Sequence, residues 1–324
     1  MGLIPISIAM CTFNGARYLG EQLSSIASQS TLPDELVICD DGSTDDTIRI
    51  LSAFATQAPF DVRIFVNEDR LGVVKNFEKA ISLCSCDIIA LSDQDDIWKL
   101  HKLARLAEAF QQHPDTAYAF SDAEMVDDLG APLGYTLWDA VGLRKSLAKF
   151  SGPRQLQMLL KKSLVTGATL AFRSSLKDVV LPIPSDWMHD GWIASLGSAL
   201  SHGVPVSESL LLYRRHAAQA CGWRTKTFWQ VFKVSMSVSG EESWKKVEQF
   251  RELHQRVVSA PPTAQATAEH LQLLREKEVH LMQRAKTRST SGISRFMRVL
   301  NELCTGRYKR FSESFWYSIM RDLC

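Results

Sequence analysis

The first 120 residues alternate short apolar segments with longer segments whose apolar residues recur at helical spacing. The apolar segments predict strands at residues 6–10, 36–39, 62–66, 87–91 and 117–120. The segments between them predict helices at 18–29, 44–55, 73–83 and 98–112. Continuously apolar strands separated by helices are typical of a mainly parallel sheet with helices on both faces. The alternation therefore predicts an α/β fold.

The remainder of the chain divides into two regions. Between residues 130 and 222 the pattern is less regular, and we expect this stretch to fold against the same sheet. Beyond about residue 223 the composition changes to helical stretches without clear strands, with a hinge at residues 260–263. We predict one domain over 1–222, with halves 1–125 and 126–222, followed by a helical region over 223–324.

Composition restricts the compartment and the partners. The formal net charge of +1 argues against a surface that complements nucleic acid, so we expect no nucleic-acid partner. The seven cysteines are an odd number scattered along the chain, which favours a reduced, cytoplasmic protein. The N-terminal apolar run lacks the features of a signal peptide, and no run reaches the roughly 20 residues that span a bilayer. Any membrane contact is expected to be peripheral.

Polar residues follow the first four predicted strands. In parallel sheets ligands bind outside the carboxyl ends of the strands, so these residues predict one shared site. Phe13 could stack on a nucleobase, or belong to the core, and Asp41 could accept hydrogen bonds from a nucleoside, or stabilise a turn. Arg70, Lys75 and Asn76 could bind phosphate or base, although exposed cations are usually just surface.

The most informative segment is Asp93-Gln94-Asp95-Asp96, where three carboxylates lie within four residues after a buried strand. Uncompensated, these carboxylates would raise each other's pKa. A divalent cation removes that conflict, and Mg²⁺ typically takes one or two carboxylates together with water and substrate phosphates. The alternative is a solvated turn that caps the helix predicted to begin at Trp98.

Taken in order, these motifs resemble the family 2 glycosyltransferases over residues 4–222. The resemblance is carried by Ser7-Ile8-Ala9-Met10-Cys11-Thr12-Phe13-Asn14, Asp40-Asp41-Gly42-Ser43-Thr44-Asp45, Asn67 with Leu71-Gly72 and Asn76-Phe77, and Leu91-Ser92-Asp93-Gln94-Asp95-Asp96-Ile97-Trp98. The last motif is most similar to that of bacterial rhamnosyltransferase-like members that build O-antigen and other surface polysaccharides.

The resemblance implies a GT-A fold with a mainly parallel, Rossmann-like sheet. It also implies inverting transfer of one sugar, from dTDP-rhamnose or a UDP-sugar, to a glycan or lipid-linked glycan with the help of Mg²⁺ or Mn²⁺. The processive synthases' Gln-x-x-Arg-Trp element is absent after Asp190, which argues for single-sugar transfer. By position, the donor-binding residues are Cys11, Thr12, Phe13, Asn14, Asp41, Arg70, Lys75, Asn76, Asp93 and Gln94.

The same resemblance assigns the metal site and the base. Asp93 and Asp95 match the Asp-x-Asp pair, with Asp95 as the direct ligand and Asp96 as support or helix cap. Asp190 stands where the family places its catalytic aspartate, as the base that takes the acceptor's proton. An N-cap for a helix over 191–201 explains Asp190 as well, and His189 is a second candidate base.

Further candidates lie near the end of the resemblance. His216 is a candidate for the metal, together with Asp95 and Asp93, or for the diphosphate, although a basic surface turn explains the segment equally well. Candidates for the diphosphate or acceptor are Arg214, Arg215, Gly167, His189 and Trp192.

Residues 284–321 contain nine Lys or Arg against Glu302 and Glu313, a net charge of about +7, interleaved with Phe296, Met297, Leu300, Phe311, Phe315 and Trp316. Basic, aromatic amphipathic helices suit the anionic inner surface of a membrane. The alternative is a helical cap or dimer contact.

Two other functions compete with sugar transfer. A nucleotidyltransferase of similar fold would have a Gly-rich, basic loop after the first strand, where this chain offers only Gly15 and Arg17. A non-catalytic nucleotide-sugar-binding scaffold would have lost the acidic cluster or Asp190, and this chain contains both.

Overall fold

The computed structural model describes residues 4–217, 240–262 and 264–323. These residues form two compact units. The sheet unit comprises 4–148, 164–197 and 201–217, and the helical unit comprises 149–163, 198–200, 240–262 and 264–323. The predicted boundary at 222/223 lies outside the described residues. We predicted one continuous domain over 1–222, whereas residues 149–163 belong to the helical unit.

The sheet unit contains one mixed sheet in the order β3-β2-β1-β4-β8-β6-β9-β5, with β7 paired to β6. The strands are β1 Ile6–Thr12, β2 Glu35–Asp40, β3 Asp61–Val66, β4 Ile88–Ser92, β5 Ile97–Trp98, β6 Tyr118–Val126, β7 Pro132–Thr136, β8 Leu170–Arg173 and β9 Gly203–Arg214. Every residue of β1, β2 and β4 is buried, which explains why these strands are continuously apolar in sequence.

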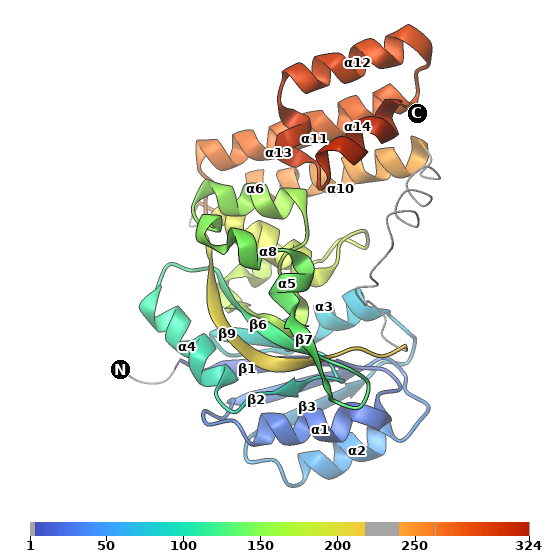
Figure 1. Cartoon of the computed structure of the whole chain (residues 1–324). Coiled ribbons are helices and arrows are strands. Elements are labelled where there is room, and N and C mark those ends of the chain that lie inside the picture. The colour runs from blue at the N-terminus through green and yellow to red at the C-terminus, as the bar shows by residue number, and fades with distance from the viewer. Residues whose placement is uncertain (1–3, 218–239, 263, 324) are drawn as a thin grey trace. The chain divides into compact units, whose positions relative to one another are not determined.

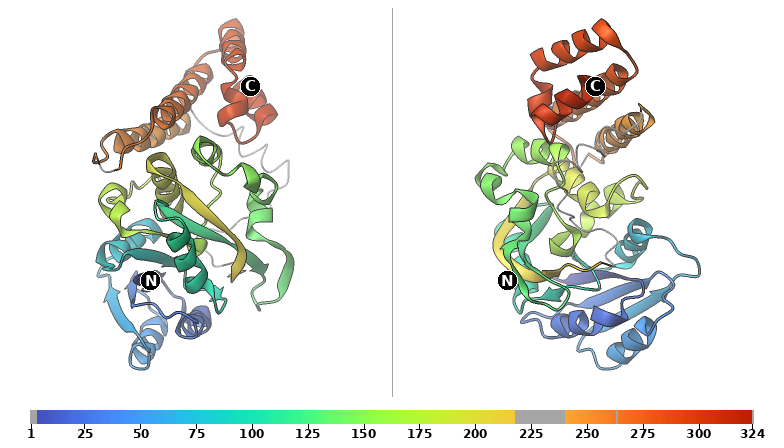
Figure 2. Two further views of the ribbon diagram at one scale, coloured as in Figure 1. Left: turned by 90° about the vertical axis from the view of Figure 1, so that its left-hand side faces the viewer. Right: turned by 45° about the vertical axis from the view of Figure 1, so that its right-hand side comes forward.

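The first four strands are parallel and are joined by α1 Ala16–Ala27, α2 Thr47–Ala55 and α3 Val73–Leu83. The chain steps from β1 to β2 to β3 and then crosses back to β4. Because such crossovers are right-handed, α1 and α2 cover one face and α3 covers the other (Figures 1 and 2). The reversal creates a topological switch point between β1 and β4, where sheets of this kind bind ligands.

The second half of the sheet departs from the predicted parallel arrangement. β8 is antiparallel to β4 and β6, β5 is antiparallel to β9, and only β6 and β9 are parallel. The irregular region does fold against the same sheet, as expected, by supplying β7, β8 and β9. These strands were not predicted, because β8 has only four residues and β9 combines Pro205 with exposed polar residues.

Several element boundaries differ from the prediction. The helix expected from Trp98 begins at Lys102, because Ile97 and Trp98 pair with Leu212 and Leu211 of β9. The remaining helices of the first 200 residues are α4 Lys102–Gln112, α5 Leu137–Val141, α6 Pro153–Lys161, α7 Lys177–Val180 and α8 His189–Leu200, with 3-10 turns at Arg144–Lys149, Gly167–Thr169 and Ser174–Leu176.

The helical unit confirms the predicted helical C-terminal region. Its helices are α6 together with α10 Gly240–Val258, α11 Ala268–Arg288, α12 Gly292–Cys304, α13 Arg307–Phe311 and α14 Phe315–Leu323. One apolar cluster centres on Val247, Leu281 and Ala285, and another on Val299, Tyr308 and Ile319. In the described parts of the chain, no helix is both long and apolar enough to cross a bilayer.

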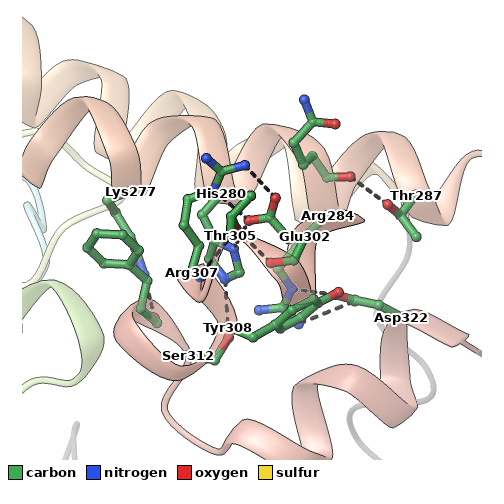
Figure 3. A network of polar contacts seen from close by, with 12 residues as sticks. Lys277, His280, Arg284, Thr287, Glu302, Thr305, Arg307, Tyr308, Ser312 and Asp322 are labelled. Atoms are coloured by element: carbon green, nitrogen blue, oxygen red, sulfur yellow. Dashed lines mark hydrogen bonds and ion pairs between the residues drawn. The ribbon is translucent and has the colours of Figure 1, made fainter. Parts of the chain in front are cut away.

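Part of the basic tail is directed into this helical unit. Asp322 is buried and binds Arg284 at 2.5 Å (Figure 3). It also binds Arg288 at 2.7 Å. Arg307 binds buried Glu302 at 2.6 Å. These cations therefore stabilise the fold instead of forming one uniformly exposed basic face. Phe311, which the sequence assigns to the amphipathic surface, is only 1% exposed, so it belongs to the core.

Candidate functional site

The loops after β1 and β4 are joined at the switch point. The amide of Phe13 donates to Gln94 Oε1 at 2.8 Å, and Gln94 Nε2 donates back to the Phe13 carbonyl at 3.1 Å. A Cβ on Gly15 would lie 2.2 Å from Gln94 Oε1, so a larger residue here would displace the Gln94 side chain. Asn14 holds the neighbouring loop, because its Oδ1 accepts from the amide of Thr44 at 2.9 Å. Gln94 thus holds Phe13, and Asn14 joins the loop after β1 to the loop after β2.

Asp41 anchors the loop between β3 and α3. Its carboxylate accepts from the amides of Leu71 at 2.7 Å and Gly72 at 2.9 Å, and from Asn67 Nδ2 at 3.0 Å. The loop carries Arg70, whose guanidinium lies 3.8 Å from the centroid of the Phe13 ring. The loops after β1, β2 and β3 therefore form one continuous rim beside the acidic loop. On this rim, the guanidinium of Arg70 covers the Phe13 ring.

In the acidic loop after β4, Asp95 and Asp96 are buried, and Asp93 and Gln94 are half-buried. Burial, together with the charges of Asp95 and Asp190, raises the pKa of Asp93 to about 7. Burial, followed by the charges of Asp95 and Asp93, also raises the pKa of Asp96. Asp96 Oδ2 is buried without a hydrogen-bond partner among the described residues. Carboxylates in this state are suited to a cation, which would stabilise their ionised form.

His216, which follows β9 near the end of the sheet unit's sequence, lies beside this loop. Its Nε2 lies 2.7 Å from Asp95 Oδ2, although 121 residues separate the two. Neighbouring Arg214 is 2% exposed, donates its backbone amide to Asp96 Oδ1 at 3.1 Å, and donates Nε to the Asp95 carbonyl at 3.0 Å. Arg214 therefore holds the acidic loop to the end of β9, and Asp96 supports β9 rather than capping α4.

These residues fit a divalent cation that takes part of its coordination from a substrate. Among the described residues, no group of three or more His, Cys, Asp or Glu side chains is gathered to hold a metal alone. Asp95 and His216 are adjacent, while Asp93 does not complete a three-ligand set with them. Two protein ligands plus diphosphate oxygens and water is a usual arrangement for Mg²⁺.

Asp190 lies in the first turn of α8, facing the acidic cluster. Its Oδ2 accepts from the amide of Gly167 at 3.0 Å and its Oδ1 from Gly191 at 2.6 Å. The N-cap position is taken by Met188, so Asp190 is not the cap that the sequence allowed. Its charge also contributes to the raised pKa of Asp93, after burial and the charge of Asp95. A carboxylate held in this way by two amides can accept a proton.

His189 is buried beneath the same turn. Its ring stacks on Phe77 with centroids 4.0 Å apart, and a Cβ on Gly167 would lie 2.7 Å from its Nε2. Neither ring nitrogen has a hydrogen-bond partner in the described part of the chain. Burial lowers the pKa of His189, so its ring stays neutral. The ring is also less exposed than Asp190. This geometry favours Asp190 over His189 as the base.

Other predicted contacts prove to be structural. Trp192 is fully buried and donates its indole N–H to the Val180 carbonyl at 2.8 Å, so it is a core residue rather than an acceptor contact. Lys75 is bound to Glu78 and to the Ile183 carbonyl, both at 2.8 Å. Asn76 is 2% exposed and donates to the Cys39 carbonyl at 2.8 Å.

The remaining predicted residues line or support the rim. Thr12 donates to Asp40 Oδ2 at 2.7 Å and is 2% exposed, so its side chain supports β2. Cys11 is buried, and burial raises the pKa of its thiol well above the ordinary value. Arg215 NH1 donates to the Tyr135 hydroxyl at 3.1 Å, which places it beside β7.

Sequence reasoning missed two sets of residues at the site. The Tyr18 hydroxyl donates to Asp128, and the Tyr18 ring lies 4.7 Å from His216, so α1 helps to orient the candidate ligand. Lys102 is fully buried behind the acidic loop and donates to the Ala168 carbonyl at 2.5 Å. Neither could be recognised in the sequence, because a tyrosine in an amphipathic helix and a lysine at a helix start are ordinary features.

The sheet order, the switch point and the aspartate-rich loop after β4 define the GT-A class of nucleotide-diphospho-sugar transferase folds. Within that class the chain belongs to glycosyl transferase family 2, whose sequence model matches residues 7–180, more than half of the chain. The resemblance inferred from the motifs is thereby confirmed.

Relatives of known sequence agree with this membership. An uncharacterized glycosyltransferase of Nostoc sp. is 30% identical over 228 residues, a match that covers 66% of this chain and 65% of the relative. The dTDP-rhamnosyl transferase RfbG of Shigella flexneri is 38% identical over 98 residues, which are 29% of this chain and 34% of RfbG.

Solved structures show the same fold. Residues 1–349 of TarS from S. aureus, in complex with UDP-GlcNAc, superpose with a TM-score of 0.59 at 15% identity, over 98% of this chain and 88% of that one. The mannosyltransferase PcManGT of Pyrobaculum calidifontis, in complex with GDP-Man and Mn²⁺, gives a TM-score of 0.51 at 15% identity, over 99% and 86%.

Proposed function

We propose that this protein transfers a single sugar, with inversion, from a nucleotide-diphosphate sugar to a glycan or lipid-linked glycan during synthesis of a cell-surface polysaccharide. The observation that carries the proposal is the placement of Asp190, held by two backbone amides, in the electrostatic environment of Asp93. An inverting reaction needs a base on one side of the anomeric carbon and a cation near the departing diphosphate on the other.

The donor would bind along the rim formed by the loops after β1 to β4. Phe13 would contact the base, Asp41 would hold the nucleoside side of the rim, and Gln94 would fix both relative to the acidic loop. We propose dTDP-rhamnose or a UDP-sugar as the donor. RfbG, which is named a dTDP-rhamnosyl transferase, and TarS, which was crystallised with UDP-GlcNAc, support this range.

We assign Asp95 and His216 as ligands of Mg²⁺ or Mn²⁺, with Asp93 beside them. The adjacency of Asp95 and His216, and the presence of Mn²⁺ with PcManGT, support this assignment. The cation would neutralise the charge that develops on the leaving diphosphate. Arg214 would keep the loop in place, and Arg215 would remain available on the β7 side.

The chemical step follows from these positions. The acceptor hydroxyl oxygen forms a bond to the anomeric carbon while the bond from that carbon to the diphosphate oxygen breaks. The hydroxyl proton passes to Asp190. The amides of Gly167 and Gly191 hold the carboxylate in position for this transfer.

Asp190→Asn tests the proposal directly. The variant keeps the shape of the side chain and an oxygen for the Gly167 amide, but it cannot accept the proton. We expect kcat to fall roughly 10²- to 10⁴-fold while donor binding is retained. The donor is first identified by screening nucleotide sugars with Mn²⁺ for protection against thermal unfolding, since a bound ligand raises stability by mass action.

Asp178→Asn is the matched control, because Asp178 is an exposed aspartate in the first turn of α7 and lies outside the site. It should turn over at the wild-type rate. A decrease of only a few-fold for Asp190→Asn would assign the base to another residue. If no nucleotide sugar protects the protein, the donor assignment fails.

We further propose that the helical unit contacts the inner face of the membrane, where a lipid-linked acceptor would be located. Exposed apolar residues recur along α12 at Ile293, Phe296, Met297 and Leu300, and along α14 at Trp316, Met320 and Leu323. Each set follows helical spacing, so each forms a stripe on one side of its helix. Lys286 and Lys309 are exposed cations in the same unit. Amphipathic helices of this composition suit anionic lipid surfaces.

A further inference from the structure

Tyr18 lies on α1 but contacts two segments that are distant from it in sequence. Its hydroxyl donates to Asp128 Oδ1 in the turn between β6 and β7. The centroid of its ring lies 4.7 Å from that of the His216 ring and 4.8 Å from the guanidinium of Arg214. The residue is only 8% exposed, so water competes little for these contacts. Tyr18 therefore joins α1, the β6–β7 turn and the end of β9 around the candidate ligand.

The course of the chain after β9 explains why both of these side chains reach Tyr18. The Arg215 amide donates to the last carbonyl of β6 at 2.9 Å, so the pairing with β6 continues past Arg214. Side chains two residues apart in an extended segment point to the same side, and the one between them points to the other. Arg214 and His216 accordingly both contact Tyr18, whereas the Arg215 guanidinium donates to Tyr135 on β7.

Asp128 holds the Tyr18 ring from its other end. The Asp128 carboxylate accepts from the Tyr18 hydroxyl and, at 2.5 Å, from the guanidinium of Arg17. The Asp128 backbone carbonyl accepts from NH1 of Arg214 at 3.0 Å. The β6–β7 turn is thereby tied to α1 through a side chain and to β9 through the backbone. Only the tie to α1 depends on which residue stands at position 128.

The Tyr18 ring restricts how the imidazole of His216 can turn. The imidazole contacts Asp95 Oδ2 through Nε2 at 2.7 Å and packs against Tyr18 with the two rings tilted by 39°. Ring pairs that are offset or tilted attract each other more than ring pairs stacked face to face. Histidines that bind a metal depend on such outer contacts for their orientation, and losing one typically costs 10- to 100-fold in metal affinity or activity.

We propose that Tyr18 is a positioning residue for His216, and that Asp128 supports it by accepting the hydrogen bond from its hydroxyl. The ring holds the imidazole beside Asp95, and the hydrogen bond to Asp128 holds the ring. The inference rests on the proposed function, because it takes His216 to be a ligand of the cation. It gives a role in metal binding to the β6–β7 turn, which carries none of the residues predicted to bind the metal.

Two substitutions separate the hydroxyl from the ring. Tyr18→Phe keeps the ring and removes only the hydrogen bond to Asp128, so we expect Mn²⁺ to bind about threefold to tenfold more weakly. Tyr18→Leu removes the ring as well, and we expect Mn²⁺ to bind at least about tenfold more weakly. The probe is Mn²⁺ alone, titrated by electron paramagnetic resonance. Asp128→Ala should match Tyr18→Phe, and combining the two should weaken binding no further, because both remove the same hydrogen bond.

His216→Ala shows whether the effect of Tyr18 passes through the imidazole. In the His216→Ala background, Tyr18→Leu should change Mn²⁺ affinity by less than about twofold, because the ring then has no imidazole to position. Damage to the fold would weaken binding in both backgrounds. Tyr135→Phe is the matched control, because Tyr135 lies on the other side of the same segment, where its hydroxyl accepts from Arg215 at 3.1 Å. It should leave Mn²⁺ affinity unchanged.

The outcomes distinguish the role of Tyr18 from the metal assignment. If His216→Ala weakens Mn²⁺ binding but Tyr18→Leu does not, the ligand assignment stands and the inference is overturned. Equal losses from Tyr18→Leu in both backgrounds also overturn it, since Tyr18 would then serve only the fold. If His216→Ala leaves Mn²⁺ affinity unchanged, the metal assignment itself fails, and the role of Tyr18 fails with it. Asp190→Asn tests the base independently of all these variants.

Discussion

At the scale of single residues, the site is a balance of buried charges. Burial disfavours the charged forms of Asp93 and Asp96, whose pKa values it raises, and of the fully buried Lys102, whose pKa it lowers to about 7. Asp95 differs from its neighbours because its side chain reaches His216 at 2.7 Å. Asp95, which we assign as a metal ligand, thus has a second potential ligand, His216, beside it.

Asp95→Ala should therefore remove metal-dependent transfer without unfolding the protein. We expect kcat with Mn²⁺ to fall at least about 100-fold, because a bound cation contributes several kcal/mol to stabilising the transition state. The melting temperature should stay equal or rise, since one of three mutually repelling carboxylates is removed. Steady-state kinetics over a range of Mn²⁺ concentrations provides the measurement.

Asp115→Ala, at an exposed position outside the site, should behave as wild type in the same assay. Full Mn²⁺-dependent activity in Asp95→Ala would remove Asp95 from the metal site.

At the scale of elements, the helical unit is held together by polar groups that helix patterning cannot reveal. His280 on α11 is 0% exposed and lies 2.6 Å from Glu302 on α12, while Asp322 on α14 binds Arg284 of α11 (Figure 3). Asp322 also binds Arg288 of α11. Burial lowers the pKa of His280 to about 4, so the ring is neutral in the folded protein. The unit therefore depends on an uncharged histidine at its centre.

This dependence predicts loss of stability in acid. The folded pKa of His280 lies below the usual 6.5, so the unfolded chain binds more protons as the pH falls from 6.5 towards 4. Between pH 7 and pH 5, His280 should decrease the free energy of unfolding by about 2 kcal/mol. His280→Gln cannot titrate in this range. Its free energy of unfolding, measured with urea at pH 7 and pH 5, should therefore decrease by about 2 kcal/mol less than that of the wild type. Equal decreases in both proteins would contradict a buried neutral His280.

At the scale of the whole molecule, membrane contact decides where the proposed reaction would occur. Removing residues 291–323 would be a poor test, because α12, α13 and α14 contribute core residues such as Val299, Tyr308 and Ile319. Substitutions of outward-facing residues leave that core intact. Phe296 and Trp316 are 52% and 74% exposed, so their replacement should cost little stability.

Phe296→Ser combined with Trp316→Ser should decrease the fraction of protein that sediments with phosphatidylglycerol vesicles by at least about tenfold, since each aromatic side chain contributes roughly 1.5–3 kcal/mol when buried. Val258→Ser, at an apolar residue of the same unit that is 63% exposed, is the control and should sediment as wild type. Unchanged sedimentation of the double variant would exclude these stripes from membrane contact. A change in molecular mass instead would identify a contact between copies of the chain.

The sequence by itself determined the parallel half of the sheet and the order of its motifs. Continuous apolar runs reflect strands buried on both faces, and polar residues at strand ends must converge because parallel strands end at one edge. Phe13, Gln94 and Asp41 were found for this reason. The family resemblance added Asp190 and His216, at positions that no periodicity in the sequence marks.

Only the tertiary structure decided how these side chains are used. The mixed second half of the sheet brings β9 next to the acidic loop, so that His216 reaches Asp95 while the guanidinium of Arg214 is used to hold the loop. Trp192 and Phe311 proved to be core residues for the same reason: which face of an element is buried depends on contacts between segments distant in sequence. Lys102 illustrates the limit most clearly, because α4 begins at Lys102 and not at Trp98, which pairs instead with Leu211 of β9.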